Sequence, residues 1–230
     1  MIVTIDGPSG TGKTTVARRV AERVGFVYFD TGAMYRALTW LALEKNADLS
    51  DPKAIETLLP LFDFRIEEEG GTKKYYVGSG EVTEVIRSQW ITAHVSQVAA
   101  QKPVRAALLK IQHHFAVERN VIFEGRDLGT VVFPNAEIKV YLTADPQVRA
   151  ERRLQEMIDK HPQQGAQIDA EAVLADIIRR DAYDSNREVA PLRCPVGAHQ
   201  IDTTHLSLDE VVNQVVDIVH RVRALSPGKL

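Results

Sequence analysis

The spacing of hydrophobic and polar residues changes once near the start of the chain, and the change predicts a strand, a loop and a helix. Residues 2–5 form a short run rich in β-branched side chains. From Lys13 onward, valines recur every four residues until Gly25, which predicts a helix that stops there. A second strand is expected at 26–30. A strand, helix and strand in this order predict a parallel sheet covered by helices.

The segment 62–86 has a different pattern. It contains the alternating run "FDFRI", the charged turn "EEEGGTKK", the apolar run "YYV" and a further turn "GSG". Alternation between glycine-containing turns is typical of antiparallel strands. We therefore expect a small antiparallel meander that forms a lobe inserted into the α/β pattern.

The rest of the chain continues with helices and buried strands. Helices are expected from about residue 32 into 46, from Pro52, over 87–100 and 104–117, after Pro146, over 168–181 and over 211–222. Strands are expected at 121–123, 138–142 and 199–204, and a polar break at 160–167. Thr31 is expected to cap the helix that follows it. Ser207 and Glu210 have the spacing of a capping box.

Composition narrows the function classes only slightly. The chain has 230 residues, of which 44% are hydrophobic and 26% charged, as in ordinary globular proteins. A net charge of −3 argues against a broad nucleic-acid-binding surface. The single cysteine excludes an intrachain disulfide, and no apolar run reaches the roughly 18 residues of a membrane-spanning helix. Since the first residues already form a predicted strand, no signal segment is expected. We expect a cytoplasmic monomer that acts on small molecules, without nucleic-acid or membrane partners.

Residues 7–14 read "GPSGTGKT", which matches the phosphate-binding loop pattern and lies between a predicted strand and a predicted helix. Glycines let backbone N–H groups turn toward phosphate oxygens, and the following helix adds its positive end. Lys13 is expected to reach the β- and γ-phosphates of ATP or GTP, and the Thr14 hydroxyl to hold Mg²⁺. The expected ATP-binding residues are Gly7, Pro8, Ser9, Gly10, Thr11, Gly12, Lys13, Thr14 and Thr15.

Four later clusters contain polar residues that the packing of a hydrophobic core does not require. They are "DTGAMYR" at 30–36, "SQVAAQKPVR" at 96–105, "EGRD" at 124–127 and "DSNR" at 184–187. Each cluster combines an arginine with a carboxylate or a hydroxyl. Two of them follow predicted strands, at the carboxyl ends where α/β sheets place their ligands.

Together with the phosphate loop, these clusters resemble the nucleoside monophosphate kinases, and among them the bacterial cytidylate kinase family. The resemblance covers nearly the whole chain through "IDGPSGTGKTT", "DTGAMYRA", the meander, "SQVAA" with "PVR", "EGRDLGTVVFP", "RDAYDSNREVAPL" and "IDTT". It implies a three-layer P-loop kinase fold of one domain around a five-stranded parallel sheet. In that fold the core is 1–40, 100–148 and 190–230, the monophosphate-binding lobe about 41–99 and the helical lid about 149–187.

The resemblance also implies residue roles. Guanidinium groups match phosphate oxygens two at a time, and the resemblance assigns Arg36, Arg126 and Arg187 to the monophosphate. The implied catalytic residues are Lys13, Arg126, Arg153, Arg180 and Arg187. The implied CMP-binding residues are Thr31, Arg36, Ser96, Arg105, Gly125, Arg126, Asp127, Asp184 and Arg187. Among these, Asp184 is assigned to the ribose, and Thr31, Ser96, Arg105 and Asp127 to the base. Thr31 stands where many relatives have serine.

The implied activity is the transfer of a phosphoryl group from ATP with Mg²⁺ to CMP and dCMP. The exocyclic amine of cytosine donates hydrogen bonds, which Asp127 with Thr31 would accept, whereas uracil presents a carbonyl there. Three alternatives stay open on the residues alone: a GTPase switch, a kinase for another small acceptor such as UMP, AMP or shikimate, and a non-catalytic ATP-binding protein. No Asn-Lys-x-Asp stretch that would read guanine is present, which argues against the GTPase.

Overall fold

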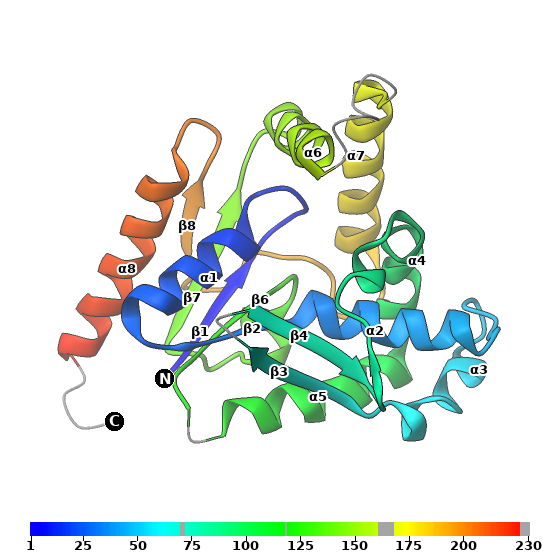
Figure 1. Ribbon diagram of the computed structural model, residues 1–230. Helices are drawn as coiled ribbons and strands as arrows, with labels where there is room; N and C mark the ends of the chain where they lie inside the picture. The colour runs from blue at the N-terminus through cyan, green and yellow to red at the C-terminus, as the bar shows by residue number, and fades with distance from the viewer. Residues whose placement is uncertain (70–71, 118, 161–167, 226–230) are drawn as a thin grey trace. The chain divides into compact units, whose positions relative to one another are not determined.

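The computed structural model describes residues 1–69, 72–117, 119–160 and 168–225. The chain forms two compact units (Figure 1). The first comprises Met1–Phe29 and Glu118–Leu230, and the second comprises Asp30–Val117. The lobe and lid boundaries expected from the sequence stay a prediction.

The first unit is built on a five-stranded sheet with the strand order β2-β6-β1-β7-β8. The strands are β1 (Ile2–Asp6), β2 (Val27–Asp30), β6 (Val121–Gly125), β7 (Ile138–Thr143) and β8 (His199–Asp202). The central strand β1 pairs in parallel with both β6 and β7, and β7 pairs in parallel with β8. Because the strands are parallel, their carboxyl ends meet at one edge, where a ligand site is expected.

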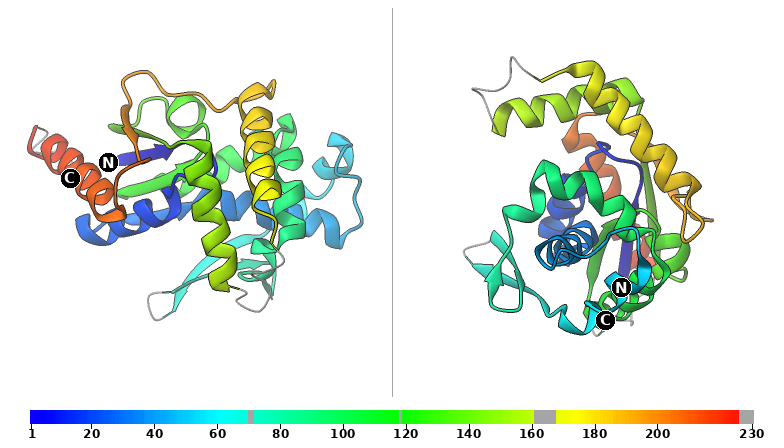
Figure 2. Two further views of the ribbon diagram at one scale, coloured as in Figure 1. Left: turned by 90° about the horizontal axis from the view of Figure 1, so that it is seen from above. Right: turned by 90° about the vertical axis from the view of Figure 1, so that its right-hand side faces the viewer.

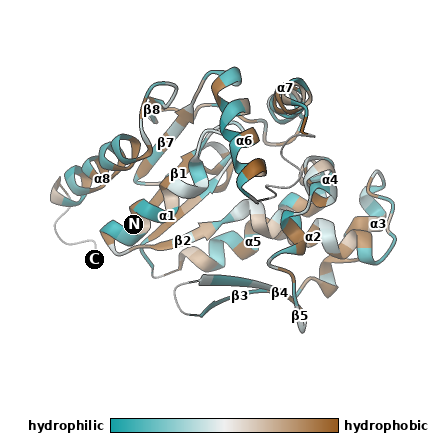
Figure 3. Ribbon diagram, turned by 45° about the horizontal axis from the view of Figure 1, so that its top comes forward, coloured by the Kyte–Doolittle hydropathy of each residue, from teal (hydrophilic) through white to brown (hydrophobic). Residues whose placement is uncertain are grey.

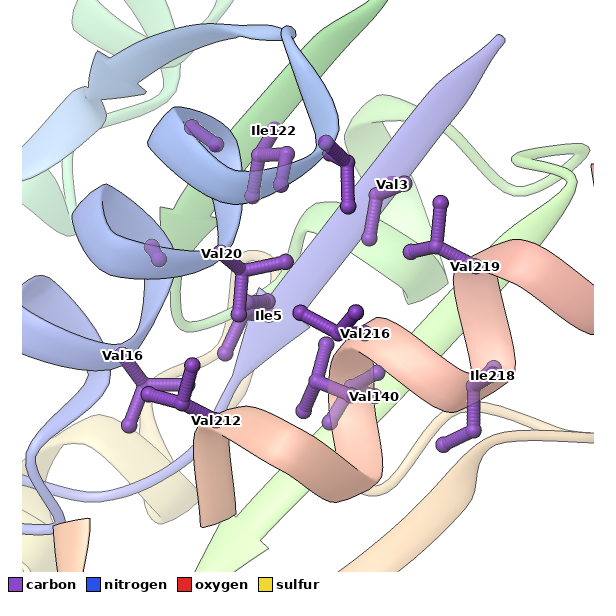
Figure 4. Close-up of a cluster of buried hydrophobic side chains, with 14 of the residues drawn as sticks. Val3, Ile5, Val16, Val20, Ile122, Val140, Val212, Val216, Ile218 and Val219 are labelled. Carbon is purple, nitrogen blue, oxygen red and sulfur yellow. The ribbon is translucent and has the colours of Figure 1, made fainter. Parts of the chain in front are cut away.

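Among the described residues, four α-helices belong to the first unit. They are α1 (Lys13–Val24), α6 (Pro146–Lys160), α7 (Ala170–Asn186) and α8 (Leu208–Leu225). Side chains of α1 and α8 meet those of the sheet in a cluster of buried aliphatic residues that includes Val20, Ile5 and Val216 (Figure 4). The turns of α8 carry both hydrophobic and hydrophilic residues, as an amphipathic helix requires (Figure 3). Helices α6 and α7 lie against each other (Figure 2).

The second unit combines an antiparallel sheet with helices. Its strands β3 (Phe64–Glu69), β4 (Thr72–Val77) and β5 (Gly80–Glu81) pair in that order. Its helices are α2 (Thr31–Glu44), α3 (Pro52–Glu56), α4 (Gln89–Ala99) and α5 (Lys102–Ala116). Nine of the fourteen residues of α2 are buried, and this helix packs against α4, α5 and β4. It is therefore the central helix of the unit.

The α/β fold class expected from the sequence is confirmed, including the five-stranded parallel sheet and the meander. The capping box is present, since the Ser207 N–H donates to Glu210 Oε2 at 2.8 Å and the Glu210 N–H donates to Ser207 Oγ at 3.3 Å. The predicted cap at Thr31 is wrong. Asp30 caps α2 by accepting the Ala33 N–H at 2.9 Å, and Thr31 is the first residue of the helix.

Two further expectations concern the polar break and membrane-spanning helices. The polar break at 160–167 lies outside the described residues from position 161 onward. Among the helices that the structure describes, none is both long and apolar enough to cross a membrane.

Candidate active site

The phosphate loop connects the end of β1 to the start of α1, as the sequence predicts. Gly7 has φ 151°, and a Cβ at this position would collide with the carbonyl oxygen of Leu142 in β7, so the loop passes too close for a side chain. Gly12 precedes α1 with φ 85°, in the left-handed region that glycine adopts without strain. The first N–H groups of α1 are therefore aimed at the loop, where an anion is favoured.

Lys13 is buried within the loop, with only 5% of its surface exposed. Its Nζ donates to the carbonyl oxygen of Pro8 at 2.6 Å. Burial lowers the pKa of Lys13 to about 7, and the positive charge of Arg126 adds to the shift, while the carboxylates of Glu124 and Asp6 oppose it. A buried amine held on a backbone carbonyl is suited to bind phosphate oxygens in its place.

Asp6, at the end of β1, fixes the turn that follows β6. Its buried carboxylate accepts the N–H groups of Leu128 at 2.9 Å and of Gly129 at 2.8 Å. Burial raises the pKa of Asp6 to about 7, although these two hydrogen bonds oppose the shift. Because the turn carries Arg126 and Asp127, this carboxylate sets the positions of two predicted site residues.

Two ion pairs join that turn to the end of α7. Arg126 Nε lies 3.1 Å from Asp184 Oδ2, and Arg187 Nη2 lies 3.2 Å from Asp127 Oδ1. The Arg187, Asp127 and Asp184 side chains are all at most 7% exposed. The structure thus brings together four of the residues that the sequence assigns to CMP, although they come from segments nearly 60 residues apart.

The positive charges near this turn repel one another. Burial lowers the pKa of Arg180, and the charges of Arg126 and Arg153 lower it further, against the opposing Asp184. The Arg180 Nε is buried and has no hydrogen-bond partner among the described residues. Arg153 is less buried and pairs with Glu156 at 2.8 Å. A bound polyanion would both relieve the repulsion and satisfy the guanidinium groups.

Five predicted CMP-binding residues remain. Gly125 is the last residue of β6, and the other four lie in the second unit, on helices that pack together. Thr31 is buried at the start of α2, and Ser96 is half-buried on α4. Arg36, on α2, donates to Thr92 Oγ1 at 2.6 Å. Arg105 is buried at the start of α5, where its Nη1 donates to the Ala99 carbonyl oxygen at 3.1 Å and its guanidinium lies over the Tyr35 ring at 5.5 Å. The two arginines are therefore held in fixed orientations.

The predicted magnesium ligand fits its position. Thr14 lies in the first turn of α1, next to Lys13, and is exposed. Magnesium in nucleotide sites commonly takes one or two protein oxygens and completes its shell with phosphate oxygens and water. Within the described residues no three His, Cys, Asp or Glu side chains gather as a metal site, and the role of Thr14 does not require one.

Sequence reasoning missed three residues of this site: Asp6, Arg149 and Asp181. Asp6 precedes the first glycine of the loop, but no spacing rule links it to residues 128 and 129. Arg149 falls in the segment assigned to the lid and receives no role from the sequence, yet it is 4% exposed and donates to the Ser9 carbonyl oxygen at 2.9 Å. Asp181 stands in the motif "RDAYDSNREVAPL", which was the available signal, although no role was assigned to it.

Comparisons with known proteins agree on a family. The family model for cytidylate kinase matches residues 3–221. A cytidylate kinase of Protochlamydia amoebophila (strain UWE25) is 45% identical over 228 residues, covering 99% of this chain and 100% of the relative. A cytidylate kinase of Bacillus subtilis (strain 168) is 41% identical over 219 residues, covering 95% and 96%. An uncharacterized protein from Eubacterium ventriosum ATCC 27560 shares the fold, with TM-score 0.51, 11% identity and coverage of 96% and 98%.

The lowered pKa of Lys13 predicts proton uptake when ATP binds. At pH 8 a lysine with a pKa of about 7 is mostly neutral. Bound phosphates favour the ammonium form, so about one proton should be taken up per ATP. Titration calorimetry in buffers of different ionisation enthalpy measures this number. The variant Lys13→Arg, charged throughout, is the control and should take up none. Equal uptake by both proteins would contradict the assignment of the shift to Lys13.

Proposed function

Because the chain belongs to the cytidylate kinase family, we propose that it transfers the γ-phosphoryl group of ATP to CMP and dCMP, giving ADP and CDP or dCDP. The observation that best supports the proposal is the buried Lys13 of the phosphate loop beside a group of mutually repelling arginines. The phosphates of two bound substrates would stabilise the charged form of Lys13 and reduce the repulsion among the arginines.

The donor is assigned to the phosphate loop, residues 7–15. The N–H groups at the start of α1 and the Lys13 ammonium bind the β- and γ-phosphates. Thr14 is proposed to hold Mg²⁺ through its hydroxyl, and the ion, when bound, would neutralise part of the charge of the phosphates. When the phosphates arrive, Lys13 exchanges its bond to the Pro8 carbonyl for bonds to phosphate oxygens.

The transfer itself depends on positioning and on positive charge. The acceptor oxygen belongs to an anionic phosphate, so no general base is assigned. Arg126, Arg153, Arg180 and Arg187 are proposed to stabilise the charge that spreads over the transferred group. Helices α6 and α7, which carry two of these arginines, are proposed as the lid that excludes water as a competing acceptor.

The acceptor base is proposed to be read by hydrogen bonds. Asp127 accepts from the exocyclic amine of cytosine with help from Thr31, while Ser96 and Arg105 donate to the ring nitrogen and carbonyl. Arg36, Arg126 and Arg187 bind the monophosphate, Asp184 contacts the ribose, and Gly125 lines the turn.

The cellular setting completes the proposal. The protein is proposed to act as a monomer in the cytoplasm, within pyrimidine nucleotide metabolism, with nucleotides as its partners rather than nucleic acid or membrane. The composition and single cysteine of the chain support this setting.

An acceptor panel tests the substrate assignment. In a coupled assay of ADP release, kcat/KM for CMP and dCMP should exceed that for UMP by roughly 10⁴-fold, because uracil would place a carbonyl against the Asp127 carboxylate. AMP should also be used far less well than CMP. GMP and shikimate complete the panel. Asp127→Asn should reduce the preference of CMP over UMP, since the amide can donate to that carbonyl. Equal turnover of UMP and CMP would refute the base assignment, and release stimulated by no acceptor would favour a binding-only protein.

The role of Arg126 is tested by comparing the effect of a variant on ATP binding with its effect on CMP turnover. Arg126→Ala should lower kcat/KM for CMP by on the order of 10²-fold, because it removes a guanidinium from the monophosphate and the transferred group. The dissociation constant of ATP should change little. Arg179→Ala is the control, because Arg179 is exposed on α7 and pairs with Asp176, three positions earlier on the same helix. An equal loss of ATP affinity and CMP turnover in Arg126→Ala would mean that Arg126 supports the fold instead.

A further inference from the structure

Two charged residues from the helices α6 and α7 bind the backbone of one residue of the phosphate loop, Ser9. Arg149 Nη1 donates to the carbonyl oxygen of Ser9 at 2.9 Å. Asp181 Oδ1 accepts the N–H of the same Ser9 at 3.3 Å. The two side chains also pair with each other, with 2.5 Å between Arg149 Nη1 and Asp181 Oδ2. Both polar groups of the Ser9 backbone are therefore bound by one ion pair.

The backbone of the phosphate loop also packs directly against Arg149. A Cβ at Gly10 would lie 3.0 Å from Arg149 Cβ and 3.2 Å from its carbonyl oxygen, so the loop backbone rests on the first turns of α6. The Arg149 side chain is 5% exposed, and its Nε is held by the carbonyl oxygen of Ala144 at 3.0 Å. This guanidinium is therefore fixed in place by the segment that leads into α6.

Burial of an ion pair has a free-energy cost that its own attraction often fails to repay. An exposed pair on the same helix, between Asp176 and Arg179, has the same 2.5 Å separation without that cost. What distinguishes the pair of Arg149 and Asp181 is its contact with the phosphate loop. Asp181 also stabilises the charged form of Lys13, since its negative charge opposes the lowering of the lysine pKa.

We propose that Arg149 and Asp181 are positioning residues for the phosphoryl donor. By binding both the N–H and the carbonyl oxygen of Ser9, they fix the loop in the shape that receives the triphosphate and couple this shape to α6 and α7. Neither residue is assigned a contact with the transferred group. The inference rests on the proposed function, because it takes the loop to be the ATP site.

Asp181→Asn tests the proposal with little change in volume. The uncharged amide removes the ion pair with Arg149 and thereby weakens the contacts that hold the Ser9 backbone. A small displacement of reacting groups can lower rates by on the order of 10²-fold. We expect the ATP dissociation constant to rise about 10-fold and kcat to fall, while KM for CMP stays within about 2-fold of wild type.

Two further variants make the test specific. Arg149→Lys keeps the charge but lacks the planar fork, and it should weaken ATP binding in the same direction. Asp176→Asn removes the exposed pair of the same helix and should leave ATP binding and turnover unchanged. The affinities are measured by calorimetry with MgATP alone, together with hydrogen exchange of the N–H groups of residues 9–14, which should be faster in Asp181→Asn and Arg149→Lys than in wild type.

The outcomes separate this inference from the proposed function. Weaker ATP binding in Asp181→Asn and Arg149→Lys supports the positioning role even if CMP is not the acceptor, because calorimetry requires no transfer. ATP affinity within 2-fold of wild type in both variants would overturn it. Equal increases in KM for CMP and in the ATP dissociation constant would also overturn it, since they indicate a general loss of structure.

Discussion

Positive charge buried at the phosphate loop is the constraint on which the site depends. Lys13 is almost fully buried, its amine is held by a backbone carbonyl, and burial together with Arg126 disfavours its charged form. Burial and the charge of Arg126 also lower the pKa of Arg180, and its buried Nε has no hydrogen-bond partner within the described residues. A fold selected for stability alone gains nothing from these features, whereas a site for polyphosphates requires them.

The sheet positions these charges through the ends of its central strands. β1 leads into the phosphate loop, and β6, its parallel neighbour, leads into the turn with Arg126 and Asp127. Asp6, on the same strand as the loop, holds that turn by two backbone N–H groups. The segment from α7 then adds Asp184 and Arg187 as ion-pair partners. Donor and acceptor residues of the first unit are thus linked through one strand.

Features that depend on local backbone chemistry were predictable from the sequence. The phosphate loop, the end of α1 at Gly25 and the capping box at Ser207 each rest on a few adjacent residues with known conformational preferences. The cap of α2 was misplaced by one position because both Asp30 and Thr31 carry an oxygen suited to capping. Only the fold determines which oxygen faces the Ala33 N–H.

Features that depend on distant pairs were not predictable from one sequence. Ser9 and Asp181 lie 172 positions apart, and Ser9 and Arg149 lie 140 apart. Arginine is rarely buried without a partner, so an arginine-rich helix is ordinarily read as an exposed face. The resemblance to a kinase family located the motif around Asp181, but assigning a contact to it required the packing of α6 and α7 on the loop.

Thermal unfolding of Lys13→Met without nucleotide tests the claim about buried charge most directly. The pKa of Lys13 is lowered on folding, so the folded state carries a penalty at and below about pH 7 that is lost as pH rises toward 10.5. The account predicts that Lys13→Met is more stable than wild type at pH 7, that the difference shrinks toward pH 10, and that MgATP raises the melting temperature of wild type alone. A variant less stable than wild type at pH 7 would contradict it.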